Sequence, residues 1–342
     1  MRAYINGISY YLPVEVLDNE KLSRIHPEWS VEKISQKTGI YKRHLSAINE
    51  FSSDMALTVI EKFFDEYKIS KSKIDFLLFC TQSPDYLLPT TACILQNKSG
   101  LPKTCGALDF NLGCSGFIYG LGLAKGLVET GQAKNVLLVT AETYTKFIHP
   151  KDKSNKTLFG DGAAVALITS EPDSDCFQAA ICNFSYGTDG SGYDNLIVRN
   201  SGIRHQCVKN EDVIDEEGNF VKNDDYLYMN GKEIFNFTAF QVPPLINKVL
   251  VENSLSLDDV AMYIFHQANE YMLDFVRKRC KIQEDKFYIS LSDGGNTVSS
   301  TIPIAMRRAI DEHKLQKGDK VLLAGFGVGL SMGGVIVEIH RS

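Results

Sequence analysis

Three residues with reactive or hydrogen-bonding side chains each follow a stretch of apolar sequence. Cys114 follows ALDFNLG, His266 follows AMYIF, and Asn296 follows YISLSDGG. Apolar stretches of this kind are typical of buried strands, and α/β proteins place their sites at the carboxyl ends of such strands. A thiol, an imidazole and an amide that meet there would suit covalent catalysis, with two groups available to stabilise negative charge.

The segment from Ala107 to Val128 predicts a strand, a tight turn and a helix around Cys114. The apolar run ends at Leu112, and Gly113 permits a turn because glycine adopts positive φ without steric cost. The apolar positions beyond Cys114 recur at helical spacing, namely Phe117, Leu121, Ala124 and Val128. A thiol beside the first turn of a helix lies near unpaired N–H groups, so we expect its thiolate to be favoured.

The second half of the chain repeats the pattern of the first. The stretch 258–269 parallels 71–83, with a helix end, an apolar strand and a polar loop in each. The stretch 287–310 parallels the strand, glycine turn and helix around Cys114, and Asn296 takes the place of the cysteine. Each reactive residue alone is compatible with a structural role, because free cysteine is commonly buried and asparagine commonly forms turns. Their occurrence at matched turns favours a shared site.

Long apolar strands that alternate with helices predict sheets covered on both faces. We expect strands within 1–12, 74–80, 107–112, 135–142, 159–168, 287–290 and 319–339. We expect helices within 30–37, 53–67, 91–98 and 229–254, the last of them interrupted near Pro243 and Pro244. The prediction is therefore two related α/β halves, residues 1–172 and 173–342. The polar stretch 209–225 is expected to form a surface loop.

The composition argues against several classes of protein. The formal net charge of −6 disfavours a general nucleic-acid-binding surface. The eight cysteines are scattered without a CxxC pair, which disfavours a disulfide framework or a structural zinc and indicates a reducing compartment. No apolar run approaches the ~20 residues of a membrane-spanning helix, and the first residues lack a signal-peptide pattern. We expect a cytoplasmic protein without metal, nucleic acid or membrane association.

Nearly the whole chain resembles the thiolase superfamily and, within it, β-ketoacyl-acyl carrier protein synthase III. The motifs that carry the resemblance are KTGIYKRH at 37–44, NLGCSGF at 111–117, FGDGA at 159–163, FHQAN at 265–269, GGNTVSSTIP at 294–303 and GFGVGLSMGG at 325–334. The resemblance implies a thiolase-like, duplicated αβαβα sandwich with two related halves and mixed sheets. It also implies an acyltransferase that performs a decarboxylating Claisen condensation of an acyl thioester with malonyl-acyl carrier protein, giving a β-ketoacyl-acyl carrier protein.

The resemblance implies a role for each residue of the site. Cys114 would hold the acyl group as a thioester, and the backbone N–H groups of Cys114 and Val328 would form the oxyanion hole. Nε2 of His266 and Nδ2 of Asn296 would donate to the malonyl thioester oxygen and stabilise the enolate. The substrates would be thioesters of CoA or of acyl carrier protein, and no other cofactor is implied.

The resemblance also places residues around the substrate, namely Lys37, Leu88, Lys153, Phe159, Lys232, Phe235 and Ala268. Lys33 stands where CoA-using members often carry an adenine-stacking tryptophan, although Trp29 is nearby, and Lys37 replaces an arginine. Lys232 replaces an asparagine near the pantetheine. Leu88 matches an aromatic residue that the partner subunit lends to limit the acyl pocket, so we expect a homodimer that accepts a longer or branched acyl group.

The arginine that docks acidic carrier protein after HQAN is absent, because Glu270, Tyr271 and Met272 follow the motif. Basic residues return one to two helical turns later, as Arg277, Lys278, Arg279 and Lys281. An acidic chain repels an acidic carrier protein unless a local basic face steers it, so we expect docking at this segment. The structural alternative is a solvated helix end.

Other activities share these residues. An acyltransferase of the same fold would pass the acyl group from Cys114 to an alcohol or amine, and a cysteine hydrolase would leave Asn296 without a role. A non-catalytic partner subunit of a condensing heterodimer would not need a complete site. The presence of both His266 and Asn296 favours condensation, because acyl transfer alone does not need both.

Overall fold

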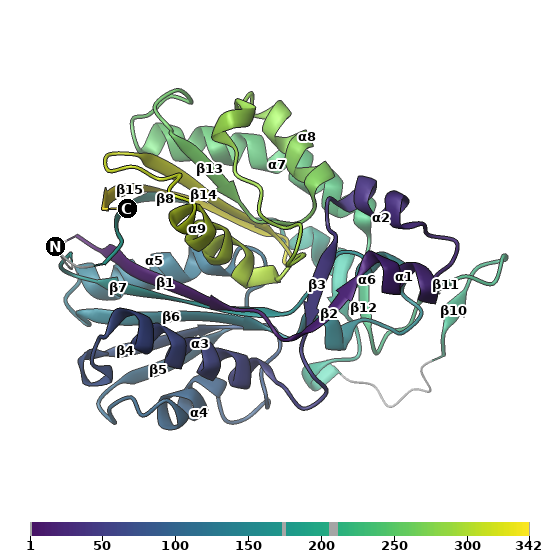
Figure 1. Cartoon of the computed structure of the whole chain (residues 1–342), viewed down its shortest axis with the longest axis horizontal. Coiled ribbons are helices and arrows are strands. Elements are labelled where there is room, and N and C mark those ends of the chain that lie inside the picture. Colours follow the sequence, from purple (N-terminus) through teal and green to yellow (C-terminus); the bar gives the residue numbers. More distant parts are fainter. Residues whose placement is uncertain (1, 173–175, 205–210, 342) are drawn as a thin grey trace.

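The computed structural model describes residues 2–172, 176–204 and 211–341. Its largest feature is a mixed nine-stranded sheet (Figure 1). The strands are, in the order in which they pair, β13 (Met262–Phe265), β14 (Lys320–Gly327), β15 (Ser331–Arg341), β8 (Gln178–Thr188), β1 (Tyr4–Tyr11), β7 (Gly162–Thr169), β6 (Asn135–Glu142), β4 (Phe76–Cys80) and β5 (Gly106–Phe110).

The two halves of the chain use the same strand order. β4 pairs in parallel with β5 and β6, and the pairs β6–β7 and β7–β1 are antiparallel. Correspondingly, β13 pairs in parallel with β14, and the pairs β14–β15 and β15–β8 are antiparallel. β1 and β8 join the halves. The predicted boundary between residues 172 and 173 adjoins residues outside the described part of the chain and stays a prediction.

The strand predicted from residue 287 is wrong. Only Phe287 forms an isolated parallel bridge, to Tyr263 of β13, at the place that β5 holds in the first half. The chain then leaves the sheet because the amide of Ser290 donates to the side chain of Gln267 at 2.7 Å rather than to a strand.

Helices fill the space between the two parts of the sheet and cover its outer faces (Figure 1). The central layer consists of α5 (Gly116–Glu129) and α9 (Thr301–Asp311), which contact strands of both halves. α3 (Ser52–Tyr67) and α4 (Thr91–Lys98) cover the first half, while α7 (Gly231–Glu252) covers the second and packs against α8 (Glu270–Arg279). This arrangement confirms the predicted αβαβα sandwich.

The remaining elements surround the end of the molecule that carries the site. They are β2 (Glu15–Asp18), α1 (Asn19–Ile25), α2 (Val31–Thr38), β3 (Lys42–Leu45), α6 (Lys153–Lys156), β9 (Leu196–Val198), β10 (Val213–Ile214), β11 (Phe220–Lys222) and β12 (Leu227–Met229). β10 and β11 form a hairpin inside the stretch 209–225, where a surface loop was expected. Residues 209 and 210 of that stretch lie outside the described residues.

The predicted interruption of the long helix near Pro243 and Pro244 is also wrong, because α7 continues through both prolines. Each proline removes one intrahelical donor, but the apolar face of the helix is buried on the sheet, including Val242 and Leu245. Tertiary packing therefore outweighs the two missing hydrogen bonds. Within the described part of the chain, no helix combines the length and apolar character needed to cross a membrane.

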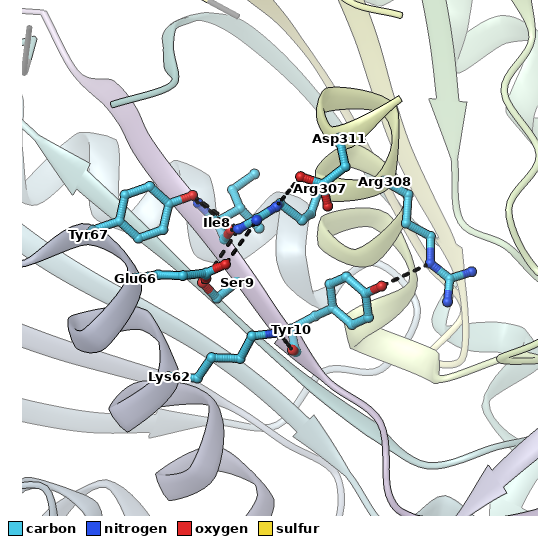
Figure 2. Close-up of polar contacts among 9 residues, drawn as sticks. All are labelled: Ile8, Ser9, Tyr10, Lys62, Glu66, Tyr67, Arg307, Arg308 and Asp311. Atoms are coloured by element: carbon cyan, nitrogen blue, oxygen red, sulfur yellow. Dashed lines mark hydrogen bonds and ion pairs between the residues drawn. The ribbon is translucent and has the colours of Figure 1, made fainter. Parts of the chain in front are cut away.

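Arg307 ties the central helix α9 to the first half of the chain (Figure 2). Its guanidinium donates to the carbonyl of Ile8 in β1 at 2.6 Å and to Glu66 of α3 at 2.9 Å. Its Nε pairs with Asp311 at 2.8 Å. The contacts to β1 and α3 therefore fix the position of the helix that follows the Asn296 turn, while the pair with Asp311 lies within α9.

Candidate active site

Cys114 lies in the turn between β5 and α5, as expected, although β5 ends at Phe110 rather than at Leu112. Its side chain is buried and belongs to the core cluster beneath α7. The end of β14 passes directly over it, since a Cβ built on Gly327 would lie 2.8 Å from the sulfur. Glycine at this position therefore permits the close approach of backbone to thiol.

The expectation that the resting thiolate is favoured is wrong. Burial, together with a smaller contribution from the Glu142 carboxyl, raises the pKa of the Cys114 thiol to about 12. Backbone hydrogen bonds from Val328 and from Cys114 itself act in the opposite direction but are outweighed. Desolvation thus exceeds the effect of the helix terminus, and the resting thiol keeps its proton. These backbone N–H groups of Cys114 and Val328, which bond to the sulfur, are the two groups that the resemblance assigns to the oxyanion hole.

His266 directly follows β13, and its amide donates to the carbonyl of Ala324 in β14 at 2.8 Å. The imidazole is almost fully buried, and Nδ1 lies 2.7 Å from the hydroxyl of Thr301. Burial lowers the pKa of His266 to about 3, and a backbone hydrogen bond to Val298 only partly offsets this effect. The ring is therefore neutral at physiological pH.

Asn296 lies in a turn that several backbone hydrogen bonds hold in place. Its amide donates to the carbonyl of Leu158 at 2.9 Å, and its carbonyl accepts from Gly160 at 3.0 Å. Gly295 has φ +68°, and a Cβ there would lie 2.9 Å from the Leu158 carbonyl, so the turn requires glycine. The Asn296 Oδ1 accepts from the Val298 amide at 2.9 Å, which leaves Nδ2 as the donor of the side chain.

The carboxyl end of β14 brings the three predicted residues together. Ala324 binds the His266 backbone, and Gly327 contacts the Cys114 sulfur. Asn296 joins the group through its bridge to Phe159, which packs in the same buried cluster as Cys114. The expected place of Phe159 beside the nucleophile is consistent with this cluster and stays a prediction.

Glu142 and Thr301 are buried at the site but were not singled out from the sequence. Glu142 ends β6, and its carboxylate accepts from the amide of Gln82 at 3.0 Å and from the hydroxyl of Ser299 at 2.8 Å. Burial raises the pKa of Glu142 to about 8. An apolar strand ending in glutamate is a weak signal in sequence, because the burial of such a residue depends on the folded neighbours.

Arg43, in the basic stretch 37–46, is fully buried. Its Nε donates to the carbonyl of Thr157 at 2.9 Å, and its guanidinium also contacts the side chain of Asn19. Burial lowers its pKa to about 9. Arg43 thereby joins α1 and α6 beneath the Asn296 turn rather than binding substrate.

A cavity of about 440 Å³ lies beside the nucleophile end of the sheet. Its lining consists of Trp29, Gln36, Lys37, Thr38, Ser154, Thr157, Leu158, Asn269 and Tyr271. Leu158 and Asn269 are the sequence neighbours of Phe159 and Ala268, but none of Cys114, His266 and Asn296 lines the cavity. The ammonium groups of Lys33 and Lys37 lie 5.4 and 5.6 Å from the centroid of the Trp29 ring.

The other predicted substrate residues do not line this cavity. Lys153 begins α6 and pairs with Glu28. Lys232 is exposed at the start of α7, and Phe235 stacks on Tyr271 and Phe275 of α8 at 5.9 and 4.8 Å. Ala268 is half-buried, and its amide donates to the carbonyl of His266 at 3.0 Å. Leu88 lies in the β4–α4 loop and is 86% exposed.

The four residues predicted to dock carrier protein lie at the end of α8, but they are not equivalent. Arg277 is only 12% exposed and pairs with Asp274 at 2.7 Å, and Lys278 pairs with the same carboxylate at 2.6 Å. Arg279 and Lys281 are exposed, and Arg279 lies over the ring of Phe240 at 5.1 Å. Asp274 offers one negative charge to two cations; Arg277 is also 3.6 Å from Glu284, whereas the Lys278 side chain is 67% exposed, so Arg277 is the least available of the four to a partner.

The duplicated fold and the buried cysteine, histidine and asparagine at the end of β14 define a condensing enzyme of the thiolase superfamily. Two family models match the chain, 3-oxoacyl-[acyl-carrier-protein (ACP)] synthase III over residues 108–190 and its C-terminal part over residues 250–339. The chain therefore belongs to the 3-oxoacyl-ACP synthase III family, which is also called β-ketoacyl-ACP synthase III.

Individual relatives match over nearly their whole length. A β-ketoacyl-ACP synthase III from Clostridium perfringens (strain 13 / Type A) is 35% identical over 333 residues, covering 97% of this chain and 98% of that one. The enzyme of the same name from Fusobacterium nucleatum is 35% identical and covers 98% of both chains. A crystal structure of a 3-oxoacyl-(acyl-carrier-protein) synthase III superposes with a TM-score of 0.94 at 43% identity, covering 99% and 100% of the two chains.

Proposed function

We propose that this protein condenses an acyl group with malonyl-acyl carrier protein through a decarboxylating Claisen reaction, giving a β-ketoacyl-acyl carrier protein. The observation that carries the proposal is the meeting of Cys114, His266 and Asn296 at the end of β14, with backbone N–H groups beside the sulfur. Membership in the synthase III family supports the same reaction.

In the first half-reaction, the Cys114 sulfur attacks the carbonyl carbon of the acyl thioester. A new carbon–sulfur bond forms, the bond to the donor thiol breaks, and the proton of Cys114 leaves with the released thiol. The N–H groups of Cys114 and Val328 stabilise the oxyanion. Because the resting thiol is neutral, this exchange requires no net change of charge in the buried site.

In the second half-reaction, malonyl-acyl carrier protein loses CO2, and the electron pair of the broken bond forms an enolate. His266 and Asn296 hold the enolate oxygen, and its carbon attacks the acyl-Cys114 carbonyl. The Cys114 thiolate leaves and takes one proton from solvent, which balances the reaction. Two neutral donors suit this step, because their dipoles stabilise a negative charge that exists only transiently.

The cavity lined by Trp29 and Lys37 supports binding of a CoA or phosphopantetheine thioester. An aromatic ring suits a nucleobase, and nearby ammonium groups suit phosphates. Lys232, Phe235 and Ala268 would line the path toward Cys114. We further propose a cytoplasmic homodimer in which the exposed Leu88 of one subunit closes the acyl pocket of the other.

Acyl transfer to an alcohol or amine is the second candidate on this fold. The hydrogen bond from the Val298 amide to Asn296 Oδ1 favours condensation, because it leaves Nδ2 as a donor that simple acyl transfer does not need. The complete set of three residues likewise disfavours a non-catalytic partner subunit.

The test is a reconstitution with an acyl-CoA panel and malonyl-acyl carrier protein labelled in its free carboxyl group. The proposal predicts release of labelled CO2 together with a carrier-bound product that contains both the acyl group and two malonyl carbons. Consumption of acyl-CoA without CO2 release, through transfer or hydrolysis, would contradict it.

A further inference from the structure

Ser115 directly follows the nucleophile and stands at the N-terminus of α5, but its hydroxyl does not cap that helix. Serine at this position ordinarily accepts a hydrogen bond from a backbone N–H of the first helical turn. Here its Oγ instead lies 2.7 Å from Oγ of Ser331, the first residue of β15. The two side chains are 1% and 4% exposed. The bond is therefore shielded from water, and it links segments that are 216 residues apart in the chain.

Ser331 extends this contact to the turn that carries Val328. Its Oγ donates to the carbonyl oxygen of Val328 at 2.9 Å. Because Ser331 has one hydroxyl proton and gives it to this carbonyl, the proton between the two serines comes from Ser115. The hydrogen bonds thus run in one direction, from Ser115 to Ser331 and from Ser331 to Val328.

The turn between β14 and β15 leaves room for the Ser331 side chain to fold back over it. Gly329 has φ +138°, and a Cβ there would lie 3.2 Å from Oγ of Ser331. Gly327 and Ser331 are paired across the two strands, so the turn between them is short. Val328 begins this turn, and the Ser331 hydroxyl holds its carbonyl group.

The two N–H groups assigned to the oxyanion hole belong to the two segments that the serines connect. Cys114 precedes Ser115 in the turn between β5 and α5, and Val328 lies in the turn between β14 and β15. An oxyanion hole acts through donors that are in place before the charge develops. A shift of one segment against the other would therefore weaken the hydrogen bonds that both donors make to one oxygen.

We propose that Ser115 and Ser331 are positioning residues that hold the two N–H groups of the oxyanion hole at the separation that one oxyanion requires. The inference rests on the proposed function, because this oxyanion is that of the acyl thioester attacked by Cys114. The serines act through the backbone segments that they join and not through contact with the substrate.

The test compares Ser115→Ala, Ser331→Ala and the double variant with a matched control, Ser300→Ala. Alanine removes the hydroxyl at one end of the tether. Ser300 is also buried, and its hydroxyl lies 2.8 Å from that of Thr140. This second pair likewise joins the two halves of the chain, but it does not involve the segments that carry the oxyanion-hole N–H groups.

The first readout is the single-turnover rate of Cys114 acylation at saturating acyl-CoA. We expect each single variant to lower this rate about tenfold, as for one lost hydrogen bond, with the half-saturating acyl-CoA concentration unchanged. The double variant should lose no more than Ser331→Ala, because the two hydroxyls form one tether. Wild-type rates in both single variants, an equal loss in Ser300→Ala, or losses that multiply in the double variant would overturn the proposal.

The second readout is the carbonyl stretching frequency of acyl-Cys114, measured by difference infrared spectroscopy with acyl-CoA labelled with ¹³C at its carbonyl. Hydrogen bonds to the carbonyl oxygen lower this frequency, so we expect a higher value in Ser115→Ala and Ser331→Ala and the wild-type value in Ser300→Ala. An unchanged frequency in both serine variants would overturn the inference and leave the proposed function intact. Failure of wild type to form acyl-Cys114 with any acyl-CoA would instead contradict the proposed function, and the inference with it.

Discussion

At the residue scale, the site is built from ionisable groups that burial keeps neutral. Desolvation raises the pKa of Cys114 and Glu142 and lowers that of His266, in each case toward the uncharged form. A buried charge without a close partner is costly, so charge arises at this site only during the reaction. This property suits a mechanism in which backbone and side-chain dipoles meet a transient oxyanion or enolate.

The variants His266→Ala and Asn296→Ala separate the two half-reactions. Both should still form acyl-Cys114, because neither side chain contacts the oxyanion hole made by backbone N–H groups. Each should lower decarboxylation of malonyl-acyl carrier protein by about 10²- to 10³-fold. Single-turnover measurement of each half-reaction checks this prediction. Equal loss of both half-reactions in both variants would contradict the assigned roles.

Glu142 predicts a specific dependence of stability on pH. Its pKa is raised from 4.5 to about 8 in the folded protein, so the folded state retains a proton that the unfolded state releases. The resulting stabilisation is complete below pH 4.5 and is lost as the pH rises through about 8. Glu142→Gln stays neutral, so its free energy of unfolding should fall less than that of wild type across this interval.

Urea unfolding at a series of pH values measures this difference. Thr140, on the same strand, offers a control as Thr140→Val, since it removes a buried polar group that does not titrate in this range. Parallel pH profiles for wild type and Glu142→Gln would show that Glu142 does not carry the shifted proton.

At the element scale, the four basic residues at the end of α8 differ in their ion pairs and exposure. Arg277 and Lys278 share Asp274, so their charges are partly compensated on the helix itself. Arg279 and Lys281 are exposed beyond them and form no ion pair with that carboxylate. We therefore test the predicted carrier-protein contact first at these last two residues.

The double variant Arg279→Glu, Lys281→Glu should raise the apparent KM for malonyl-acyl carrier protein, because it reverses the charge that attracts an acidic partner. Acylation of Cys114 by a small acyl thioester should stay unchanged. Lys68→Glu with Lys317→Glu, two exposed lysines on other elements, is the matched control for net charge. Steady-state kinetics at two salt concentrations measure both, and an unchanged KM and salt dependence would exclude docking at the end of α8.

The sequence predicts most elements because their signals are local. The period of apolar residues locates α5, and the glycines at 113 and 295 locate the turns that carry Cys114 and Asn296. Where tertiary packing decides, local signals fail. α7 continues through two prolines because its apolar face is buried against the sheet. The strand expected from residue 287 does not form, and the amide of Ser290 donates to the side chain of Gln267 instead.

The same difference between local signals and tertiary packing applies to the site. The three reactive residues are recognisable because each ends an apolar strand. The burial of Arg43, the pKa of Cys114 and the contact between His266 and Thr301 depend on segments that are far apart in sequence. These features determine protonation, so the reactive groups are predictable from sequence but their charge states are not.

At the scale of the whole molecule, the exposed edge of the sheet agrees with a dimer. β5 is an outermost strand, and Leu108 within it is 46% exposed. In the adjoining β4–α4 loop, Leu87 and Leu88 are 71% and 86% exposed. An open strand edge flanked by apolar side chains is a surface that proteins usually cover.

Light scattering at micromolar concentration should therefore give twice the chain mass of 38.1 kDa. Leu108→Lys should weaken the dimer, because it places a charge in the apolar surface, whereas Leu123→Lys tests whether the exposed face of α5 belongs to the same interface. A wild-type monomer with full activity would contradict both the interface and the role given to Leu88.

The central claim is that Cys114 carries the acyl group, and intact-protein mass spectrometry after incubation with acyl-CoA tests it most directly. Wild type should gain the mass of one acyl group and lose it when malonyl-acyl carrier protein is added, while His266→Ala should gain it and retain it. Cys114→Ala should gain no acyl mass. Acylation of Cys114→Ala to the wild-type extent would show that another residue is the nucleophile and would contradict the account.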